Sequence, residues 1–129
     1  MTGGGNVITV DTKVTYGFEL HCNPNRKPND LEVNWESGNR FHLGRLTTAS
    51  CSDDPAIMPN PPKAGFDTYH GTGTGLYNGS PDATAEWTFT DAGEPGDNDT
   101  ATIIIKDADG NTVLSVSGSL NGGNNQAHH

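Results

Sequence analysis

The stretch DAGEPGDNDT, residues 91–100, gathers four carboxylates: Asp91, Glu94, Asp97 and Asp99. Its glycines and its proline allow the chain to fold back on itself and to bring these side chains together. Carboxylates on one loop repel one another unless a cation or hydrogen-bond donors compensate, and Ca²⁺ takes about six to eight oxygen ligands. The stretch therefore predicts one of two things. Either the four acids form a Ca²⁺ site, or they belong to a hairpin turn and face water or accept backbone N–H bonds.

A second acidic stretch, DADGN at residues 107–111, follows a β-branched run. It alternates side chains like the start of an EF-hand loop, but Thr112 stands where that loop has Gly and Gly118 stands where it has Glu. We expect a hairpin turn here, with Gly110 at positive φ. A strand of about seven residues, each rising about 3.4 Å, separates the two acidic stretches, so they cannot form one site.

The remaining chemistry-bearing residues form no catalytic motif. Glu94 and Asp97 have a spacing that a glycosidase pair can use, but the sequence places no apolar pocket around either one. No nucleophile motif, triad or metal-ligand spacing occurs, so we expect no enzyme. His21 and His42 are expected to point outward on neighbouring strands, where they would either pair around a transition metal or face water.

Aromatic residues are the other candidates for a binding site. Trp35 and Trp87 alternate with polar neighbours and are expected in the core. Tyr69 and Tyr77 flank a Gly-Thr run, where exposed rings would stack on sugars. These two tyrosines are therefore the predicted ligand-binding residues of a carbohydrate-binding module, which is the alternative to a structural module.

The chain has two cysteines, Cys22 and Cys51, and no C-x-x-C pair, which argues against a cysteine-based zinc or redox motif. Both are expected at the ends of strands that run in the same direction, two strands apart. That spacing is about 10 Å, so a bridge requires the loops to bend inward by a few ångströms. We predict a Cys22–Cys51 disulfide, with two free thiols as the alternative.

Alternating apolar and polar residues predict a series of strands. The clearest are KVTYGFELHC (13–22), LEVNWE (31–36), RFHLGRLTTASC (40–51), FDTYHGTGTGLYNG (66–79), ATAEWTFT (83–90), ATIIIKD (101–107) and TVLSVSGSL (112–120). Gly44 is predicted to mark a bulge. The four prolines of residues 52–65 predict a long connection that crosses from one sheet to another. Glycines 3–5 and 122–123 predict a close approach of the two terminal strands.

No helical period is present, so we predict one all-β domain over residues 1–129, an antiparallel β-sandwich of roughly seven to nine strands. The formal charge is −9, with seven Lys and Arg against sixteen Asp and Glu, and no basic cluster exceeds Arg26-Lys27. We therefore expect no nucleic-acid partner. No apolar stretch approaches the roughly 20 residues of a membrane span, so no membrane insertion is expected.

Several motifs resemble a bacterial domain family. They are TGGGNVI (2–8), YGFEL (16–20), GTGTG (71–75), TDAGEPGDNDTATIIIKDADGNTV (90–113) and GSLNGGNNQAH (118–128). Together they resemble the post-choice-of-anchor accessory domain of bacterial secreted and surface proteins; residues 22–64 match it weakly. The resemblance implies a non-catalytic extracellular β-domain attached to a larger protein.

We therefore expect an accessory or adhesion-type module, secreted or on the cell surface, with Ca²⁺ as its candidate cofactor. Its expected partners are the neighbouring domains of the parent protein and a glycan. Met1 and His128-His129 are typical of an expressed fragment that carries part of a tag. The sequence leaves the oligomeric state open.

Overall fold

Nine antiparallel strands make up the part of the chain that the computed structural model describes, residues 1–9, 12–54, 65–92 and 99–127. The strands are β1 (Thr2–Ile8), β2 (Lys13–Glu19), β3 (Asp30–Trp35), β4 (Asn39–Ser52), β5 (Thr68–Tyr77), β6 (Ser80–Thr90), β7 (Thr100–Lys106), β8 (Thr112–Ser119) and β9 (Gly122–Gln126). Within these ranges no helix is long and apolar enough to cross a membrane. The prediction of an all-β antiparallel fold is confirmed.

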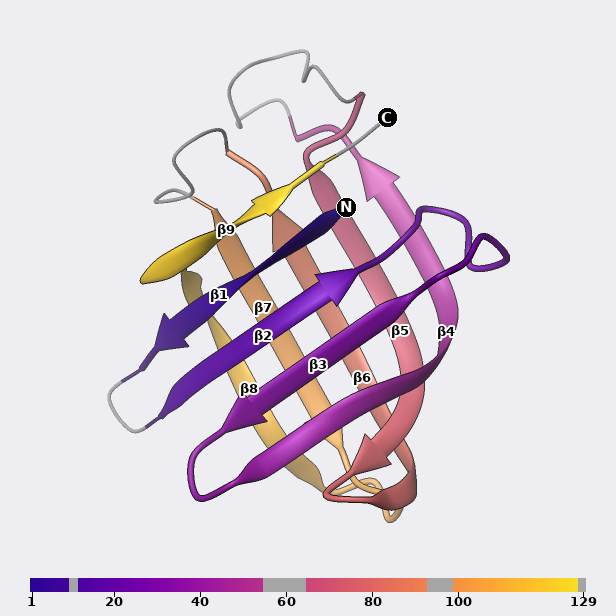
Figure 1. Ribbon diagram of the computed structural model, residues 1–129, viewed down its shortest axis with the longest axis vertical. Helices are drawn as coiled ribbons and strands as arrows, with labels where there is room; N and C mark the ends of the chain where they lie inside the picture. The colour runs from indigo at the N-terminus through magenta and orange to yellow at the C-terminus, as the bar shows by residue number, and fades with distance from the viewer. Residues whose placement is uncertain (10–11, 55–64, 93–98, 128–129) are drawn as a thin grey trace.

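The strands form a single sheet in the order β8-β7-β6-β5-β4-β3-β2-β1-β9. This sheet curls, so that β9, β1, β2 and β3 lie in front of β8, β7, β6 and β5 (Figure 1). The two layers are thus two halves of one hydrogen-bonded sheet. The predicted antiparallel β-sandwich is therefore not confirmed, because the described strands form one curled sheet.

Strand β4 joins the two layers because it is long and bends. It has fourteen residues, of which the first few pair with β3 and most pair with β5. Its register with β5 shifts twice, between Leu43 and Arg45 and between Leu46 and Thr48. The first shift is the bulge predicted at Gly44. Bulges bend a strand and increase its twist, which lets β4 turn from the front layer into the rear one.

The connection at residues 52–65 leads from β4 to β5, which are hydrogen-bonded neighbours. The prediction that this connection crosses between sheets is therefore wrong, although most of its residues lie outside the described ranges. The prolines correctly predicted that the strand ends near residue 52. It could not reveal that the bent strand itself, and not the loop, carries the chain from one layer to the other.

Apolar side chains from both layers fill the interior. Tyr16 and Phe18 of β2 stack on Phe89 of β6, with ring centroids 4.9 and 4.4 Å apart. Since β2 and β6 belong to opposite layers, these rings hold the two halves of the sheet together. Trp35 and Trp87 are buried, as predicted. Each fully buried side chain of this size contributes roughly 1.5–3 kcal/mol from removal of its surface from water.

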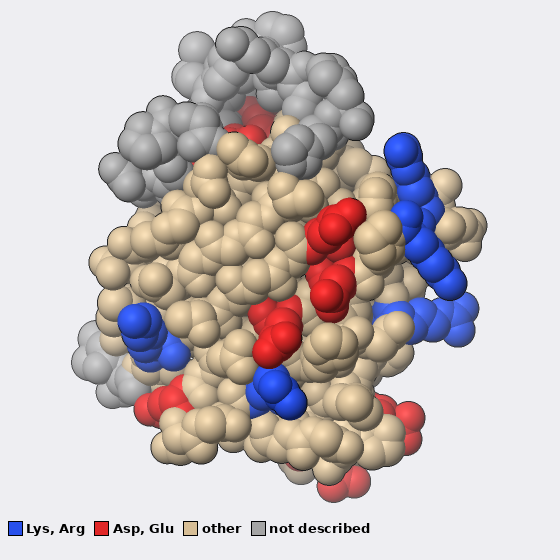
Figure 2. All heavy atoms as spheres, in the orientation of Figure 1, with Lys and Arg blue, Asp and Glu red and all other residues tan. Residues whose placement is uncertain are grey.

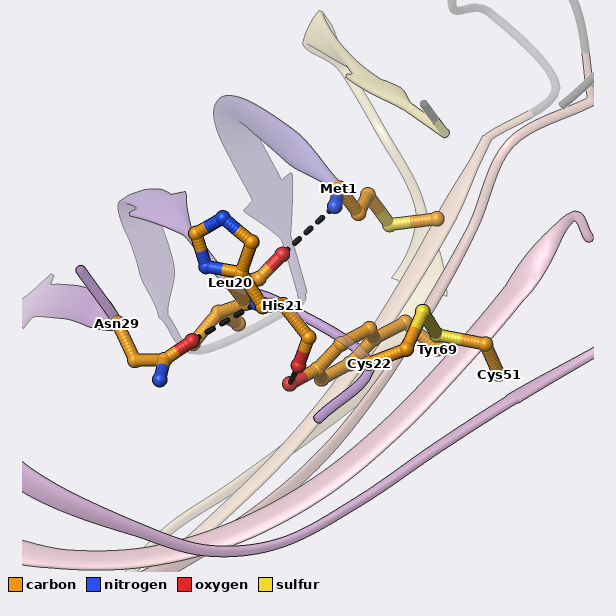
Figure 3. Close-up of a disulfide and its surroundings, with 7 residues drawn as sticks. All are labelled: Met1, Leu20, His21, Cys22, Asn29, Cys51 and Tyr69. Atoms are coloured by element: carbon orange, nitrogen blue, oxygen red, sulfur yellow. Dashed lines mark hydrogen bonds between the residues drawn. A yellow bond between two sulfur atoms is a disulfide. The ribbon is translucent and has the colours of Figure 1, made fainter. Parts of the chain in front are cut away.

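Cys22 and Cys51 form the predicted disulfide, with their Cα atoms 5.7 Å apart (Figure 3). Strand β3 begins only at Asp30, so Cys22 lies in the loop beyond the edge of β3. Cys51 lies near the end of β4, where that strand no longer pairs with β3. No strand separates the two cysteines at this level, which is why the expected gap of two strands closes. Disulfides are typical of proteins outside the reducing cytoplasm.

Three hydrogen bonds support the loop that carries Cys22 (Figure 3). The amino group of Met1 donates to the carbonyl of Leu20 at 2.7 Å. The N–H of His21 donates to Asn29 Oδ1 at 2.8 Å, and the hydroxyl of Tyr69 donates to the carbonyl of His21 at 2.9 Å. The loop is therefore held to both layers by polar contacts as well as by the disulfide.

The terminal strands β1 and β9 pair side by side, as the glycines predicted. Gly5 lies opposite Gly123, and a Cβ on Gly5 would come within 2.3 Å of the carbonyl oxygen of Gly122. Only glycine permits this backbone approach.

Candidate functional site

Four aspartates form a row at one end of the sheet, and we call them the aspartate row: Asp53, Asp67, Asp91 and Asp99. Each lies next to a strand end, since β4 ends at residue 52, β5 begins at 68, β6 ends at 90 and β7 begins at 100. The residues at these ends are opposite one another in the ladder. Because neighbouring strands are about 4.8 Å apart, the fold places four carboxylates from distant parts of the sequence along one edge.

Asp99 is fully buried and binds the backbone of two other segments. Its Oδ1 accepts the N–H of Ala92 at 2.7 Å, and its Oδ2 accepts the N–H of Asn125 at 2.8 Å. Ala92 follows β6 in the rear layer, and Asn125 belongs to β9 in the front layer. Hydrogen bonds to an ionised group contribute about 1.5–3 kcal/mol each, so Asp99 connects the two layers strongly.

Asn125 completes this contact, and it is fully buried as well. Its Nδ2 donates to the carbonyls of Thr90 and Thr100 at 2.9 and 3.0 Å, and its Oδ1 accepts the hydroxyl of Tyr16 at 2.7 Å. The burial of Tyr16 raises the pKa of its hydroxyl; the hydrogen bond to Asn125 acts in the opposite direction, and the charge of Asp99 adds to the rise. The amide thus links β9 to β2, β6 and β7.

Asp91 has a similar contact with the end of the chain. Its Oδ2 accepts the N–H of Ala127 at 2.9 Å, and its own N–H donates to the carbonyl of Asp67 at 2.8 Å. Asp91 and Asp99 together therefore accept two N–H groups from the C-terminal segment, at positions 125 and 127.

Asp67 is almost completely buried, at 2% exposure. Its Oδ1 accepts the N–H of Asp54 and the hydroxyl of Thr68, both at 2.9 Å, but its buried Oδ2 has no hydrogen-bond partner. Asp53 lies at the neighbouring strand end, directly after Ser52, whose carbonyl accepts the N–H of Asp67 at 3.0 Å. Partial desolvation, then the charge of Asp67 and the hydrogen bond with it, and finally the charge of Asp54 raise the pKa of Asp53.

The predicted Ca²⁺ site of Asp91, Glu94, Asp97 and Asp99 falls only partly within the described chain, because Glu94 and Asp97 lie outside it. For Asp91 and Asp99 the structure shows backbone N–H groups as partners, which is what the alternative interpretation expected. Within the described ranges, no group of three or more His, Cys, Asp or Glu could hold a metal ion. The Ca²⁺ site made by all four acids stays a prediction.

The tyrosines predicted to bind carbohydrate face the interior. Tyr69 has no exposed surface, so the expectation that its ring is exposed is wrong. Tyr77 is half-buried and stacks on Trp35, with ring centroids 5.8 Å apart and planes 11° apart. The two positions are an even number of residues apart on β5, so both point to the inner face. A pair of exposed rings for sugar stacking is therefore not formed by these two residues.

A basic hollow lies at the edge of the molecule, beside the loop between β2 and β3. It has a volume of about 780 Å³, and its polar lining includes Lys27, Arg45, Asn25, Asn29 and Thr47, with no Asp or Glu. Figure 2 shows Lys and Arg gathered along this edge, while acidic side chains form a line across the neighbouring face. The hollow could not be predicted from the sequence, because Lys27 lies in the loop between β2 and β3, Arg45 lies on β4, and the two come together only when β4 bends.

Sequence analysis also missed two members of the aspartate row, Asp53 and Asp67. They are separated by the proline-rich connection and carry no local motif. A usable signal existed for Asp53 alone, because it is the first acidic residue after the predicted strand 40–51; Asp67 lies within the predicted strand 66–79. No family model matches the chain, and no curated protein or solved structure matches it.

Proposed function

We propose that this chain is a non-catalytic accessory module of a bacterial extracellular or cell-surface protein. The observation that supports it is the use of the buried acids: Asp99 and Asp91 accept backbone N–H groups of the chain's own C-terminal segment. A carboxylate whose oxygens bind the backbone serves the fold, since it has no free oxygen directed at a substrate. The carboxylates of Asp91 and Asp99 thus stabilise the fold of the module.

Two further features support the location. The Cys22–Cys51 disulfide is typical of oxidising compartments. The resemblance to the post-choice-of-anchor domain implies a location on the bacterial surface within a larger parent protein. In that protein this module would support a neighbouring region.

The substitution Asp99→Asn tests whether the acid serves the fold. We expect the melting temperature to fall by roughly 10 °C, because the Ala92 and Asn125 N–H groups bind different oxygens of Asp99 and Asn would place an NH₂ donor at one of these positions. Asp109→Asn, in the exposed turn after β7, is the matched control and should melt like the parent chain. An Asp99→Asn variant as stable as the parent would contradict the proposal, since functional acids often cost stability and structural ones supply it.

The same pair of variants tests the function in the cell that produces the protein. Antibody labelling of intact cells should detect the parent protein at the surface. Asp99→Asn should reduce its amount and its resistance to added protease, while Asp109→Asn should not. Exclusive detection in the cytoplasmic fraction would refute the extracellular role.

A second candidate function is binding of an acidic polysaccharide in the basic hollow. The observation that favours it is charge separation: a chain with a formal charge of −9 has Lys27 and Arg45 in one hollow that lacks acidic residues. Carboxylate groups of a polyuronate would pair with these cations, and the amides of Asn25 and Asn29 would bind its hydroxyls. This form of carbohydrate recognition needs no exposed aromatic ring.

Binding of polygalacturonate, measured by calorimetry at low and at moderate salt, tests this candidate. The double change Lys27→Gln with Arg45→Gln should weaken binding at least tenfold. Lys106→Gln, a basic residue on β7 away from the hollow, should leave it unchanged, and neutral dextran should not bind. The candidate fails if the parent chain does not bind, or if the double variant binds equally well.

A further inference from the structure

One buried carboxylate oxygen of the aspartate row, Asp67 Oδ2, has no hydrogen-bond partner. Oδ1 of the same carboxylate accepts two hydrogen bonds. Burial of an ionised oxygen without compensation costs several kcal/mol. A partner for this oxygen would therefore stabilise the fold.

A second carboxylate at the neighbouring strand end makes this cost larger. Asp53 belongs to the next strand end along the row: it follows Ser52, whose carbonyl accepts the N–H of Asp67 at 3.0 Å. Partial desolvation, and after it the charge of Asp67, are among the causes that raise the pKa of Asp53. None of the ion pairs between described residues includes Asp53 or Asp67. Two carboxylates, one exposed and one buried, therefore come from neighbouring strand ends, and no described cationic side chain forms an ion pair with either.

We propose that Asp53 and Asp67 bind a Ca²⁺ ion at the ends of β4 and β5. A divalent cation between the two carboxyl groups would give the orphan Oδ2 a partner and would replace their repulsion by attraction. Asp53 is exposed, so the ion has access from solvent. Asp67 Oδ1 is already positioned by the N–H of Asp54 and the hydroxyl of Thr68, which orients the carboxylate before the ion arrives.

Ca²⁺ fits this pair better than a transition metal. Both ligands are carboxylate oxygens, and Ca²⁺ accepts such ligands in flexible geometry together with carbonyls and water. With two carboxylates, water must complete much of the coordination, so the affinity should resemble that of extracellular modules, with Kd on the order of 10⁻⁴ to 10⁻³ M. This inference goes beyond the proposed function and does not rest on it, because the ion would stabilise the module whatever its role.

Melting in 10 mM CaCl₂, 10 mM MgCl₂ or chelator tests the proposal with the metal itself as the probe. We expect Ca²⁺ to raise the melting temperature by about 4 to 10 °C relative to chelator, and Mg²⁺ to raise it less. Equilibrium dialysis should show that each chain binds about one Ca²⁺ ion.

Asp53→Asn is the decisive variant, because Asp53 is exposed and its substitution leaves the core intact. It should abolish the Ca²⁺ response, and Asp67→Asn should do the same if that variant folds. Asp97→Asn and Asp109→Asn should keep the response, which distinguishes this pair from the acidic stretch at 91–99.

Three results would overturn the proposal. One is a melting temperature that Ca²⁺ does not change, as expected if the two carboxyl groups share a proton instead. Another is a Ca²⁺ response that Asp53→Asn retains. The third is an equal response to Mg²⁺, which would indicate general screening of an acidic chain.

Discussion

At the scale of single residues, the buried polar groups of Tyr16, Asn125 and Asp99 act together. The Nδ2 of Asn125 donates two hydrogen bonds and its Oδ1 accepts one. Each oxygen of Asp99 accepts an N–H. Buried polar networks stabilise a fold when every member is satisfied, and the loss of one partner exposes the others to the full cost of desolvation. This trio therefore determines how firmly β9 is held.

The tyrosines of the interior predict an alkaline loss of stability. Burial raises the pKa of both Tyr16 and Tyr69 above the ordinary value of about 10. The unfolded chain therefore releases these protons at lower pH than the folded chain, and the free energy of unfolding should fall as the pH rises above about 10. Chemical denaturation between pH 8 and 11, with tyrosinate absorbance recorded in parallel, measures this decline.

Tyr16→Phe is the variant for that experiment. At neutral pH it should lose about 1–2 kcal/mol, because Asn125 Oδ1 is left buried without a donor. Above pH 10 its decline should be shallower than that of the parent chain, since one protected hydroxyl has been removed. An equally steep decline in Tyr16→Phe would show that Tyr16 does not contribute to the alkaline transition.

At the scale of elements, strand ends and glycines explain most of the architecture. The aspartate row exists because four neighbouring strands end at the same level, and the bend exists because β4 carries bulges. The pairing of β1 with β9 depends on backbone contact that side chains would prevent.

Gly5→Ala tests the close approach of the terminal strands. Its Cβ would lie 2.3 Å from the carbonyl oxygen of Gly122, so β9 must move away from β1. We expect a loss of about 2–3 kcal/mol, as for other overpacked sites, and faster proteolysis of the C-terminal segment.

Gly17→Ala on the adjacent strand β2 is the matched control. A Cβ there meets nothing closer than 4.0 Å, so its stability should change by less than about 1 kcal/mol. Similar losses of stability in Gly5→Ala and Gly17→Ala would mean that the conformational preference of alanine, and not contact with β9, causes the loss.

At the scale of the whole molecule, covalent and polar ties connect the two layers of one curled sheet. The disulfide joins the loop after β2, in the front layer, to the part of β4 that has entered the rear layer. The stacked rings of β2 and β6 and the Asn125 contacts connect the layers elsewhere. The curled sheet thus needs no second sheet to cover its core.

Removal of the disulfide should destabilise the fold without changing it. The bridge closes a loop with a sequence separation of 29, so Cys22→Ser with Cys51→Ser should cost about 3–4 kcal/mol in the chain-entropy model. Denaturant unfolding of the double variant and of the parent chain, with and without reductant, measures this. The reductant should shift only the parent chain; a shift of both would indicate an effect other than reduction of this bond.

Local patterns in the sequence sufficed to predict the all-β class, the strands, the bulge at Gly44, the two core tryptophans and the approach of the terminal glycines. Most of these features depend on the alternation of apolar and polar residues, which acts between residues close in sequence. The approach of the terminal strands depends on the small size of their glycines. The cysteine pairing was also predicted, although the reason that the gap closes, the late start of β3, was not.

The tertiary structure alone decided what distant residues do together. Alternation indicates which side of a strand is buried but not how a sheet curves, so one curled sheet and a sandwich look alike in the sequence. For the same reason the burial of Tyr69, the grouping of Lys27 with Arg45, and the row of Asp53, Asp67, Asp91 and Asp99 became visible only when strand order and bending brought them together. The sequence determined which residues carry charge, and the curvature of the sheet determined which of those charges meet.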